Sequence, residues 1–224
     1  MATVTLTFDN GPDPAVTPGV LDCLAAHGIK STFFVLGERV SDAARAPLAR
    51  RALDEGHRVG NHTFSHSTPL GELSREAALN EFDRTEAALD LLQGPRSRRL
   101  FRPYGGRGAV GPHLLHPAVV ERLESGGHTC VLWNVVPGDF RYPDDWPQRA
   151  LDACRAREWS LVVLHDIYTT TLAHLGSFIR RLKDEGFAFT QEYPPECMPI
   201  VDGRIVLPME NYCGGCQSSD SEIS

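Results

Sequence analysis

The most constraining feature of the sequence is a regular alternation of strand-like and helix-like segments, which runs from Thr3 to about Thr190. Short runs rich in β-branched and aromatic residues predict strands, and the longer stretches between them predict helices. The predicted strands are residues 3–8, 31–35, 58–61, 100–102, 130–133, 161–164 and 187–190. The predicted helices are residues 18–27, 43–55, 75–92, 113–124, 146–158 and 172–185. Repeated βα units of this kind predict a parallel α/β sheet with helices outside, either closed into a barrel or left open and doubly wound.

The length of the chain favours a single domain. It has 224 residues, 42% of them hydrophobic, which is enough for one sizeable core and too few for two ordinary domains with a linker. We expect this domain to cover residues 1–192. Residues 193–224 form a tail that we leave unassigned, because repeated prolines break the alternation there. In this tail Cys213 and Cys216 have the spacing of redox or zinc sites, but no second pair accompanies them, so we expect free thiols.

Charge and hydropathy exclude two classes of partner. There are 22 Lys and Arg against 29 Asp and Glu, a net charge of -7, so we expect no nucleic-acid partner. No stretch approaches the roughly 18 apolar residues of a membrane span, and residues 1–8 lack the basic and apolar regions of a signal peptide. We therefore expect a cytoplasmic protein without a membrane partner. The sequence indicates no oligomeric state.

Ionisable and metal-binding side chains follow several of the predicted strands. Asp9 and Asn10 come directly after the first strand, His62 follows the third, Arg102 ends the fourth and His165 follows the sixth. Asp139 lies in the loop after the fifth strand. Because the carboxyl ends of parallel strands meet at one edge of a sheet or barrel, we expect these side chains to gather there.

Two local patterns in this set point to metal chemistry. His62 and His66 are four residues apart, so a helical turn would place both imidazoles on one face, where they could bind one divalent ion. The alternative is a pair of surface or capping histidines. Asp9 and Asn10 precede a Gly-Pro turn that would leave both side chains at the strand mouth. The alternative there is an ordinary turn in which they cap backbone groups.

Together these residues resemble the polysaccharide deacetylases with a NodB homology domain, carbohydrate esterase family 4. The resemblance runs from Thr5 to about Thr190 and rests on five motifs in the order of the family. These are similar to residues 7–12 (TFDNGP), 62–66 (HTFSH), 101–105 (FRPYG), 133–140 and 164–166 (LHD). It implies a distorted (β/α) barrel, with a NodB-type domain over residues 1–192. It also implies a hydrolase that removes acetyl groups from N-acetylglucosamine units or O-acetylated sugars with the help of a metal.

The resemblance implies a role for each matching position. Asp9 is expected to be the general base and His165 the general acid, with Asp139 holding His165 and Arg102 pairing with Asp9. The expected metal ligands are Asn10, His62 and His66. The expected substrate and oxyanion residues are Tyr104, Gly105, Phe140 and Trp133. The implied metal is a divalent cation, with Zn²⁺ ahead of Co²⁺, Ni²⁺ or Mn²⁺.

The sequence departs from the family at three of these motifs. Asn10 stands where the family has its metal-binding Asp, and an amide oxygen brings no negative charge to the ion. Three outcomes follow: weak metal binding through Asn10, replacement of that ligand by Asp9, or a reaction that needs no metal. The third motif is one residue short, and Phe140 replaces the usual Trp or Tyr of the groove. We therefore expect a small-molecule or short-oligosaccharide substrate.

Two other functions remain open at this point. One is an amide or cyclic-amide hydrolase on the same fold that depends weakly or not at all on a metal, which Asn10 would permit. The other is a non-catalytic carbohydrate-binding relative. Retention of Asp9 and His165 argues against the latter, because a binding protein has no use for a matched base and acid.

Overall fold

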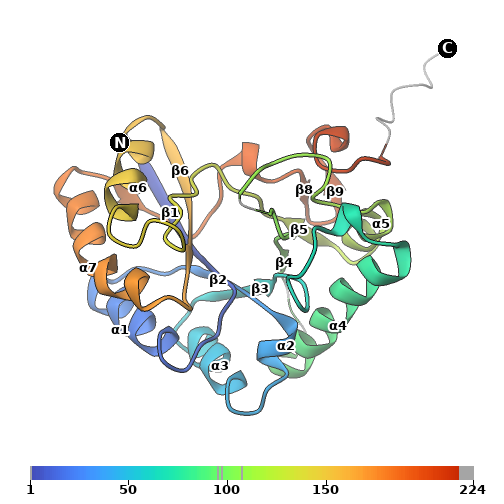
Figure 1. Ribbon diagram of the computed structural model, residues 1–224, viewed down its shortest axis with the longest axis horizontal. Helices are drawn as coiled ribbons and strands as arrows, with labels where there is room; N and C mark the ends of the chain where they lie inside the picture. Colours follow the sequence, from blue (N-terminus) through green and yellow to red (C-terminus); the bar gives the residue numbers. More distant parts are fainter. Residues whose placement is uncertain (1, 95, 97, 107, 217–224) are drawn as a thin grey trace.

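A single curled β-sheet forms the centre of the molecule, and helices surround it (Figure 1). The computed structural model describes residues 2–94, 96, 98–106 and 108–216. The strands are β1 (Thr3–Asp9), β2 (Thr32–Val35), β3 (Arg58–Asn61), β4 (Arg99–Phe101), β5 (His128–Cys130), β6 (Trp159–His165), β7 (Ala188–Phe189), β8 (Ile200–Val201) and β9 (Arg204–Ile205). Their order in the sheet is β6-β1-β2-β3-β4-β5-β8-β9, with β7 pairing with β1.

The first seven strands pair with one another only in the parallel direction, as the alternation predicted. The long strands β1 and β6 lie side by side over their full length, from Thr3 opposite Trp159 to Asp9 opposite His165. Both are almost entirely buried: β6 reads as a largely apolar run, whereas β1 alternates threonine with apolar residues.

Residues 131–135 connect β4 with β6 across the open side of the curled sheet. The strand predicted at 130–133 is a regular strand only up to Cys130; beyond it the chain crosses from β4 towards β6. The backbone N–H of Val131 donates to Phe101 in β4, and that of Val135 donates to Leu161 in β6. This irregular closure makes the fold a distorted (β/α) barrel. The predicted fold class is thus confirmed, and the open doubly wound alternative is wrong.

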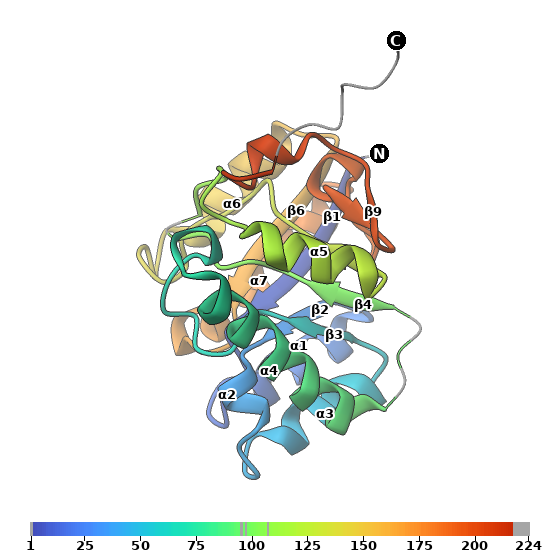
Figure 2. The same cartoon turned by 90° about the vertical axis from the view of Figure 1, so that its right-hand side faces the viewer.

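The helices form an outer ring in which α6, α7, α1, α3, α4 and α5 pack one against the next. They are α1 (Thr17–His27), α2 (Gly37–Val40), α3 (Ala46–Asp54), α4 (Arg75–Gln93), α5 (Pro117–Ser125), α6 (Trp146–Arg155) and α7 (Thr169–Asp184), with short 3-10 helices at Leu70–Glu72, Pro195–Cys197 and Met209–Asn211. Figure 2 shows α4 and α5 covering one face of the sheet. No helix in the described ranges has both the length and the apolar character that crossing a bilayer requires.

Three apolar clusters among the described residues hold the barrel together. The largest lies between the strands and the helix ring and includes Leu6, Val162 and Phe178. The second includes Phe82 in α4, Phe101 in β4 and Val119 in α5. A smaller cluster joins strands that are not neighbours in the sheet, and so lies within the curl: Phe34, Leu100, Val131, Leu161, Tyr193 and Cys197. Two of its members, Tyr193 and Cys197, come from the stretch that the sequence left unassigned.

The segment after residue 192 packs on the barrel as far as it is described. β8 pairs with β5 in the antiparallel direction and continues the sheet, and β9 folds back on β8. Residues 217–224, part of the predicted tail, lie outside the described residues.

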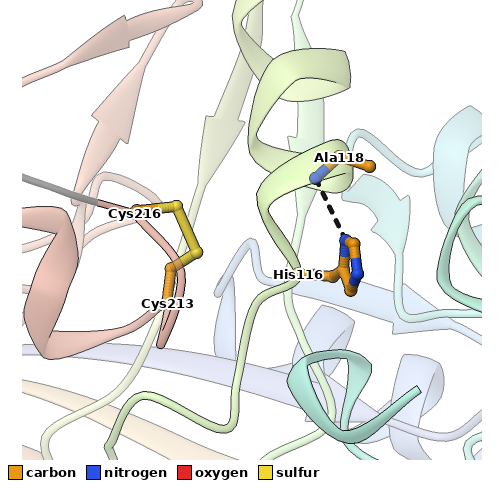
Figure 3. The surroundings of a disulfide bond; sticks show 4 residues. All are labelled: His116, Ala118, Cys213 and Cys216. Carbon is orange, nitrogen blue, oxygen red and sulfur yellow. Dashed lines mark hydrogen bonds between the residues drawn. A yellow bond between two sulfur atoms is a disulfide. The ribbon is translucent and has the colours of Figure 1, made fainter. Parts of the chain in front are cut away.

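Cys213 and Cys216 form a disulfide, so the expectation of free thiols is wrong. The two intervening glycines allow a turn that brings the Cα atoms within 5.4 Å. Figure 3 shows this disulfide near the first turn of α5, where the His116 Nδ1 accepts the N–H of Ala118. The disulfide therefore closes a small loop that packs against the chain entering α5. The backbone N–H of Gly214, inside this loop, donates to the carbonyl of Pro112.

Candidate active site

The registers of the parallel strands bring the predicted site residues to one end of the barrel. Asp9 lies opposite His165 on one side and Phe34 on the other. Asn61 lies opposite Phe101, so the residues that follow them, His62 and Arg102, leave neighbouring strands at the same level. A cavity of about 220 Å³ opens at this end. It is lined by Asp9, Asn10, His62, His66, Pro103, Tyr104, Gly105, Gly106, Gly108, Trp133, Val136, Phe140, Val163, His165 and Tyr168.

Arg102 lies fully buried behind the cavity and fixes Asp9. Its Nη1 donates to Asp9 Oδ1 at 2.8 Å and to Thr7 Oγ1 at 2.7 Å. Its Nε donates to the Val131 carbonyl at 3.1 Å, and its Nη2 donates to the Leu132 carbonyl at 3.0 Å. The guanidinium charge thus has an anionic partner and directed acceptors on two segments of the barrel, as a buried charge requires.

This environment keeps Asp9 ionised. Burial by itself would raise the pKa of the Asp9 carboxyl, but the Arg102 guanidinium, helped by the neighbouring imidazoles, lowers the pKa below its usual value. The Oδ2 of Asp9 is the oxygen that Arg102 leaves free, and it lies 3.5 Å from His62 Nε2. An ionised carboxylate with one oxygen on the cavity side can serve as a general base.

The imidazole of His62 is oriented by the backbone. Its Nδ1 lies 2.8 Å from the Arg102 carbonyl, which can only accept, so Nδ1 carries the proton and the Nε2 lone pair faces the cavity. The His66 ring lies with its centroid 4.8 Å from that of His62 and 3.9 Å from that of Tyr104. Burial lowers the pKa of both histidines, that of His66 to about 3, so both rings are neutral and can offer lone pairs.

The segment that carries these two histidines is not helical, contrary to the expected helical turn. Thr63 and His66 adopt left-handed backbone angles, with φ of 67° and 55°. The Glu81 carboxylate accepts the N–H groups of Phe64 and Ser65, which holds the tight turn in place. The two imidazoles converge because of this turn and not because of helical periodicity.

Asn10 completes a set of donors that could hold a metal. It adopts a left-handed conformation with φ of 75°, and its Oδ1 is buried with no hydrogen-bond partner among the residues described. Within those residues, no three His, Cys, Asp or Glu side chains form a ready metal site. An orphaned amide oxygen beside two neutral imidazoles nevertheless fits a divalent cation, with one negative charge fewer than a carboxylate would supply.

His165 and Asp139 form a buried ion pair on the other side of Asp9. Asp139 Oδ1 accepts from His165 Nδ1 at 2.7 Å. Its Oδ2 accepts from the His165 backbone N–H at 2.8 Å and from the Thr171 hydroxyl at 2.7 Å. Burial opposes a charge on His165, but the hydrogen bond and the charge of Asp139 outweigh it and raise the pKa of the imidazole above its usual value. Protonated His165 can therefore act as a general acid.

A third buried carboxylate of this region, Asp166, lies beneath the turn after β1. Asp166 Oδ2 accepts the Thr17 hydroxyl at 2.6 Å, and burial raises the pKa of Asp166 to about 6. A Cβ atom on Gly11 would lie 2.1 Å from that Oδ2, so only glycine allows the turn to approach so closely. The contact with Asp166 thereby fixes the position of the turn that carries Asn10.

Aromatic side chains form the walls of the cavity. Trp133 donates through Nε1 to the Gly108 carbonyl at 2.9 Å, and its ring lies so close to Gly105 that a Cβ there would approach to 2.4 Å. The Phe140 ring is 44% exposed and stands edge-to-face with His165, at 5.5 Å between centroids. A half-exposed ring such as that of Phe140 suits the apolar face of a sugar.

The predicted site residues are thus gathered in one place. All of them line the cavity except Arg102 and Asp139, which lie behind it and contact Asp9 and His165. The sequence did not single out Thr7 and Thr171, whose hydroxyls complete the hydrogen bonding of Arg102 and Asp139. The run of three threonines after the fifth motif was the only available signal for Thr171.

Comparisons with known proteins identify the family of this chain. The sequence pattern of the polysaccharide deacetylase family matches residues 2–129. The peptidoglycan-N-acetylglucosamine deacetylase PgdA of Listeria monocytogenes is 33% identical over 186 residues, covering 83% of this chain and 37% of the length of PgdA. The chitooligosaccharide deacetylase of Sinorhizobium fredii is 32% identical, and the match covers 82% of this chain and 87% of that enzyme.

The fold agrees with that of a solved relative. The peptidoglycan deacetylase PdaC from Bacillus subtilis superposes with a TM-score of 0.69 at 30% sequence identity, covering 85% of this chain and 87% of that one. Sequence pattern, pairwise identity and fold lead to the same conclusion: this chain belongs to the polysaccharide deacetylase family.

Proposed function

We propose that this protein is a metal-assisted deacetylase that hydrolyses the acetamide of an N-acetyl amino sugar in a short saccharide or related small molecule. The observation that carries the proposal is the convergence of an ionised Asp9 and a protonatable His165 on one cavity that two neutral imidazoles also line. A base and an acid with opposite shifts in pKa are what hydrolysis of an unactivated amide requires.

In this mechanism water adds to the acetyl carbonyl, the C–N bond breaks, and acetate and a free amine leave. Asp9 takes the proton from the attacking water, since its Oδ2 is the oxygen not bound by Arg102. His165 gives its proton to the departing nitrogen, and Asp139 stabilises the imidazolium until then. The base is needed because water is a weak nucleophile, and the acid is needed because an amine is a poor leaving group unless it is protonated.

Asn10, His62 and His66 would hold the divalent metal, with Zn²⁺ as the first choice. When bound, the metal would lower the pKa of water and polarise the acetyl carbonyl. The backbone around Tyr104 and Gly105, on the same cavity, would then face the developing negative charge on the carbonyl oxygen.

Asn10 also supports a second candidate, a hydrolase of amides or cyclic amides with little need for a metal. A site with two imidazoles and a neutral amide binds metal more weakly than one with a carboxylate. Acetate release in the presence of a strong chelator separates the two candidates. Activity lost with the chelator and restored by Zn²⁺ or Co²⁺ supports the first, and full activity in its presence supports the second.

The test of the catalytic roles is Asp9→Asn, assayed by acetate release from N-acetylglucosamine oligomers. We expect kcat to fall by at least about 100-fold, the contribution typical of a general base, with little change in saccharide affinity. Asp54→Asn is the matched control, since Asp54 is an exposed carboxylate at the end of α3. An Asp9→Asn enzyme with the wild-type rate would overturn the assignment of the base.

A further inference from the structure

We propose that the loop between Asp139 and α6, together with the first turn of α6, forms a binding subsite for a carboxylate group on the substrate, built from Arg141 on the loop and Arg149 in the helix. The inference rests on the proposed deacetylase function. It starts from a second cavity of about 600 Å³ beside the catalytic one. Gly108, Val136 and Phe140 belong to the walls of both cavities, and the second is completed by Pro137, Gly138, Arg141, Tyr142 and Arg149.

Arg149 is held in a fixed orientation at this cavity. Its Nε donates to the Pro137 carbonyl at 3.0 Å, and its guanidinium carbon lies 4.1 Å from the centroid of the Tyr142 ring. These contacts leave the terminal nitrogens of the guanidinium without a carboxylate partner in the part of the chain that the structure describes. An arginine immobilised in this way loses little side-chain entropy when it binds a ligand.

Arg141 brings a second positive charge to the same ring, with its guanidinium carbon 5.5 Å from the Tyr142 centroid. It is exposed, and it too makes no ion pair within the described ranges. The carboxylates on the same loop are engaged elsewhere or point to solvent. Asp139 is buried against His165, whereas Asp144 and Asp145 are exposed and line neither cavity; Asp144 Oδ1 lies 3.7 Å from His174 Nε2. Among the described residues that line this cavity, Arg141 and Arg149 are thus the charged ones, and both are positive in a protein of net charge -7.

Backbone hydrogen bonds fix the conformation of this loop. Gly138 has a φ of 77°, and a Cβ atom there would come within 3.1 Å of the Tyr142 ring. The N–H groups of Arg141 and Tyr142 both donate to the Gly138 carbonyl, and the buried Trp146 donates to Tyr142. Because Asp139 precedes Phe140 on this same loop, the subsite is fixed relative to the general acid.

The position and chemistry of the subsite indicate its ligand. A guanidinium fork matches the two oxygens of a carboxylate, and two guanidiniums beside one cavity favour an anion over a neutral hydroxyl. The shared wall at Phe140 means that the group bound here lies close to the acetamide in the catalytic cavity. We infer that the substrate is an acidic N-acetyl amino sugar, with a carboxylate on the ring that carries the acetamide or on the adjoining ring.

The experiment compares two saccharides that differ in one charge. A disaccharide containing N-acetylmuramic acid carries a carboxylate next to the acetamide-bearing carbon, and its methyl ester keeps the shape without the charge. We expect the wild-type enzyme to have a kcat/KM about 10-fold higher for the acid than for the ester, the size typical of one hydrogen bond between charged groups. High salt should reduce this ratio, because the arginines are exposed to solvent.

Arg149→Met should reduce the acid-to-ester ratio to about one, and Arg149→Lys should retain part of it because the charge remains. Arg157→Met is the matched control, since Arg157 is exposed beyond α6 and lines neither cavity. A ratio unchanged by Arg149→Met overturns the subsite. If the wild-type protein releases acetate from neither saccharide, nor from N-acetylglucosamine oligomers, the proposed function fails. In that case, calorimetry measures the affinities of the acid and the ester for the same variants. Tighter binding of the acid that is lost in Arg149→Met supports the subsite, and equal affinities overturn it.

Discussion

Replacing Asp139 with Asn should weaken His165 as an acid and shift the activity to lower pH. In the wild-type protein, Asp139 Oδ1 accepts from His165 Nδ1, while Oδ2 accepts from the Thr171 hydroxyl and the His165 N–H. An Asn oxygen in the Oδ2 position still accepts from the Thr171 hydroxyl and from the backbone N–H of His165. Its NH₂ group then faces Nδ1 as a donor, which an imidazolium cannot accept. The substitution therefore preserves the local fold and removes the support for the charged ring.

The size of the shift follows from this lost bond. A hydrogen bond to a charged group contributes about 1.5–3 kcal/mol, and one pKa unit corresponds to about 1.36 kcal/mol, so the pKa of His165 should fall by roughly 1–2 units. His165 acts in its protonated form, so activity is lost as the pH rises through its pKa. That pKa lies above the ordinary value of 6.5 in the wild type, and the loss should begin at correspondingly lower pH in the variant.

The measurement is kcat/KM for acetate release across a range of roughly pH 5 to 9, where the alkaline limb reports the essential acid of the free enzyme. Asp144→Asn, an exposed carboxylate on the same loop, is the control and should leave the profile in place. An NMR titration of His165 gives a second readout if the variant is too slow to assay. The reasoning is refuted if the alkaline limb and the His165 titration both coincide with those of the wild type.

Three further changes test other parts of the site. Asn10→Asp should tighten Zn²⁺ binding by at least about 10-fold because it restores a negative charge to the ion, and an unchanged metal titration would show that position 10 is not a ligand. Arg102→Met should destabilise the protein by about 3–5 kcal/mol in urea unfolding, since it leaves the Asp9 charge buried and unpaired. A loss below about 1 kcal/mol would contradict that account. Gly11→Ala should lower the melting temperature, because its Cβ would overlap the Asp166 carboxylate at 2.1 Å, and wild-type stability would show that the turn can move aside.

The sequence predicted the alternation of strands and helices well because its signals are local, while closure into a barrel was implied by the family resemblance. Strands such as β2 and β6 are buried on both faces and read as short apolar runs, and the helices α1, α3 and α4 are followed by Gly28, Gly56 and Gly94. It failed where the conformation depends on distant partners. The helix predicted from residue 113 begins at Pro117, since the preceding Leu115 donates its N–H to Tyr212 in the tail. The four-residue helix α2 was missed because it is too short to show a period.

The candidate site shows the same division. The motifs identified the side chains that converge, because strand ends in a parallel barrel must meet, whatever the loops do. They could not identify Thr171 or the two arginines of the second cavity, whose significance lies in contacts across elements. They also suggested a helical turn for His62 and His66, although the rings meet through left-handed residues. The catalytic and metal-binding roles of the convergent residues remain predictions for the assays above.

The bonding of Arg102 has a consequence for how enzymes of this architecture can change. The same guanidinium neutralises Asp9 and connects β1 to the segment that crosses from β4 to β6. A mutation there cannot alter the strength of the base without also loosening the scaffold. New acid–base chemistry on this framework, whether selected or designed, is therefore more accessible through exposed positions at the rim, such as Phe140, which can vary without loss of folding.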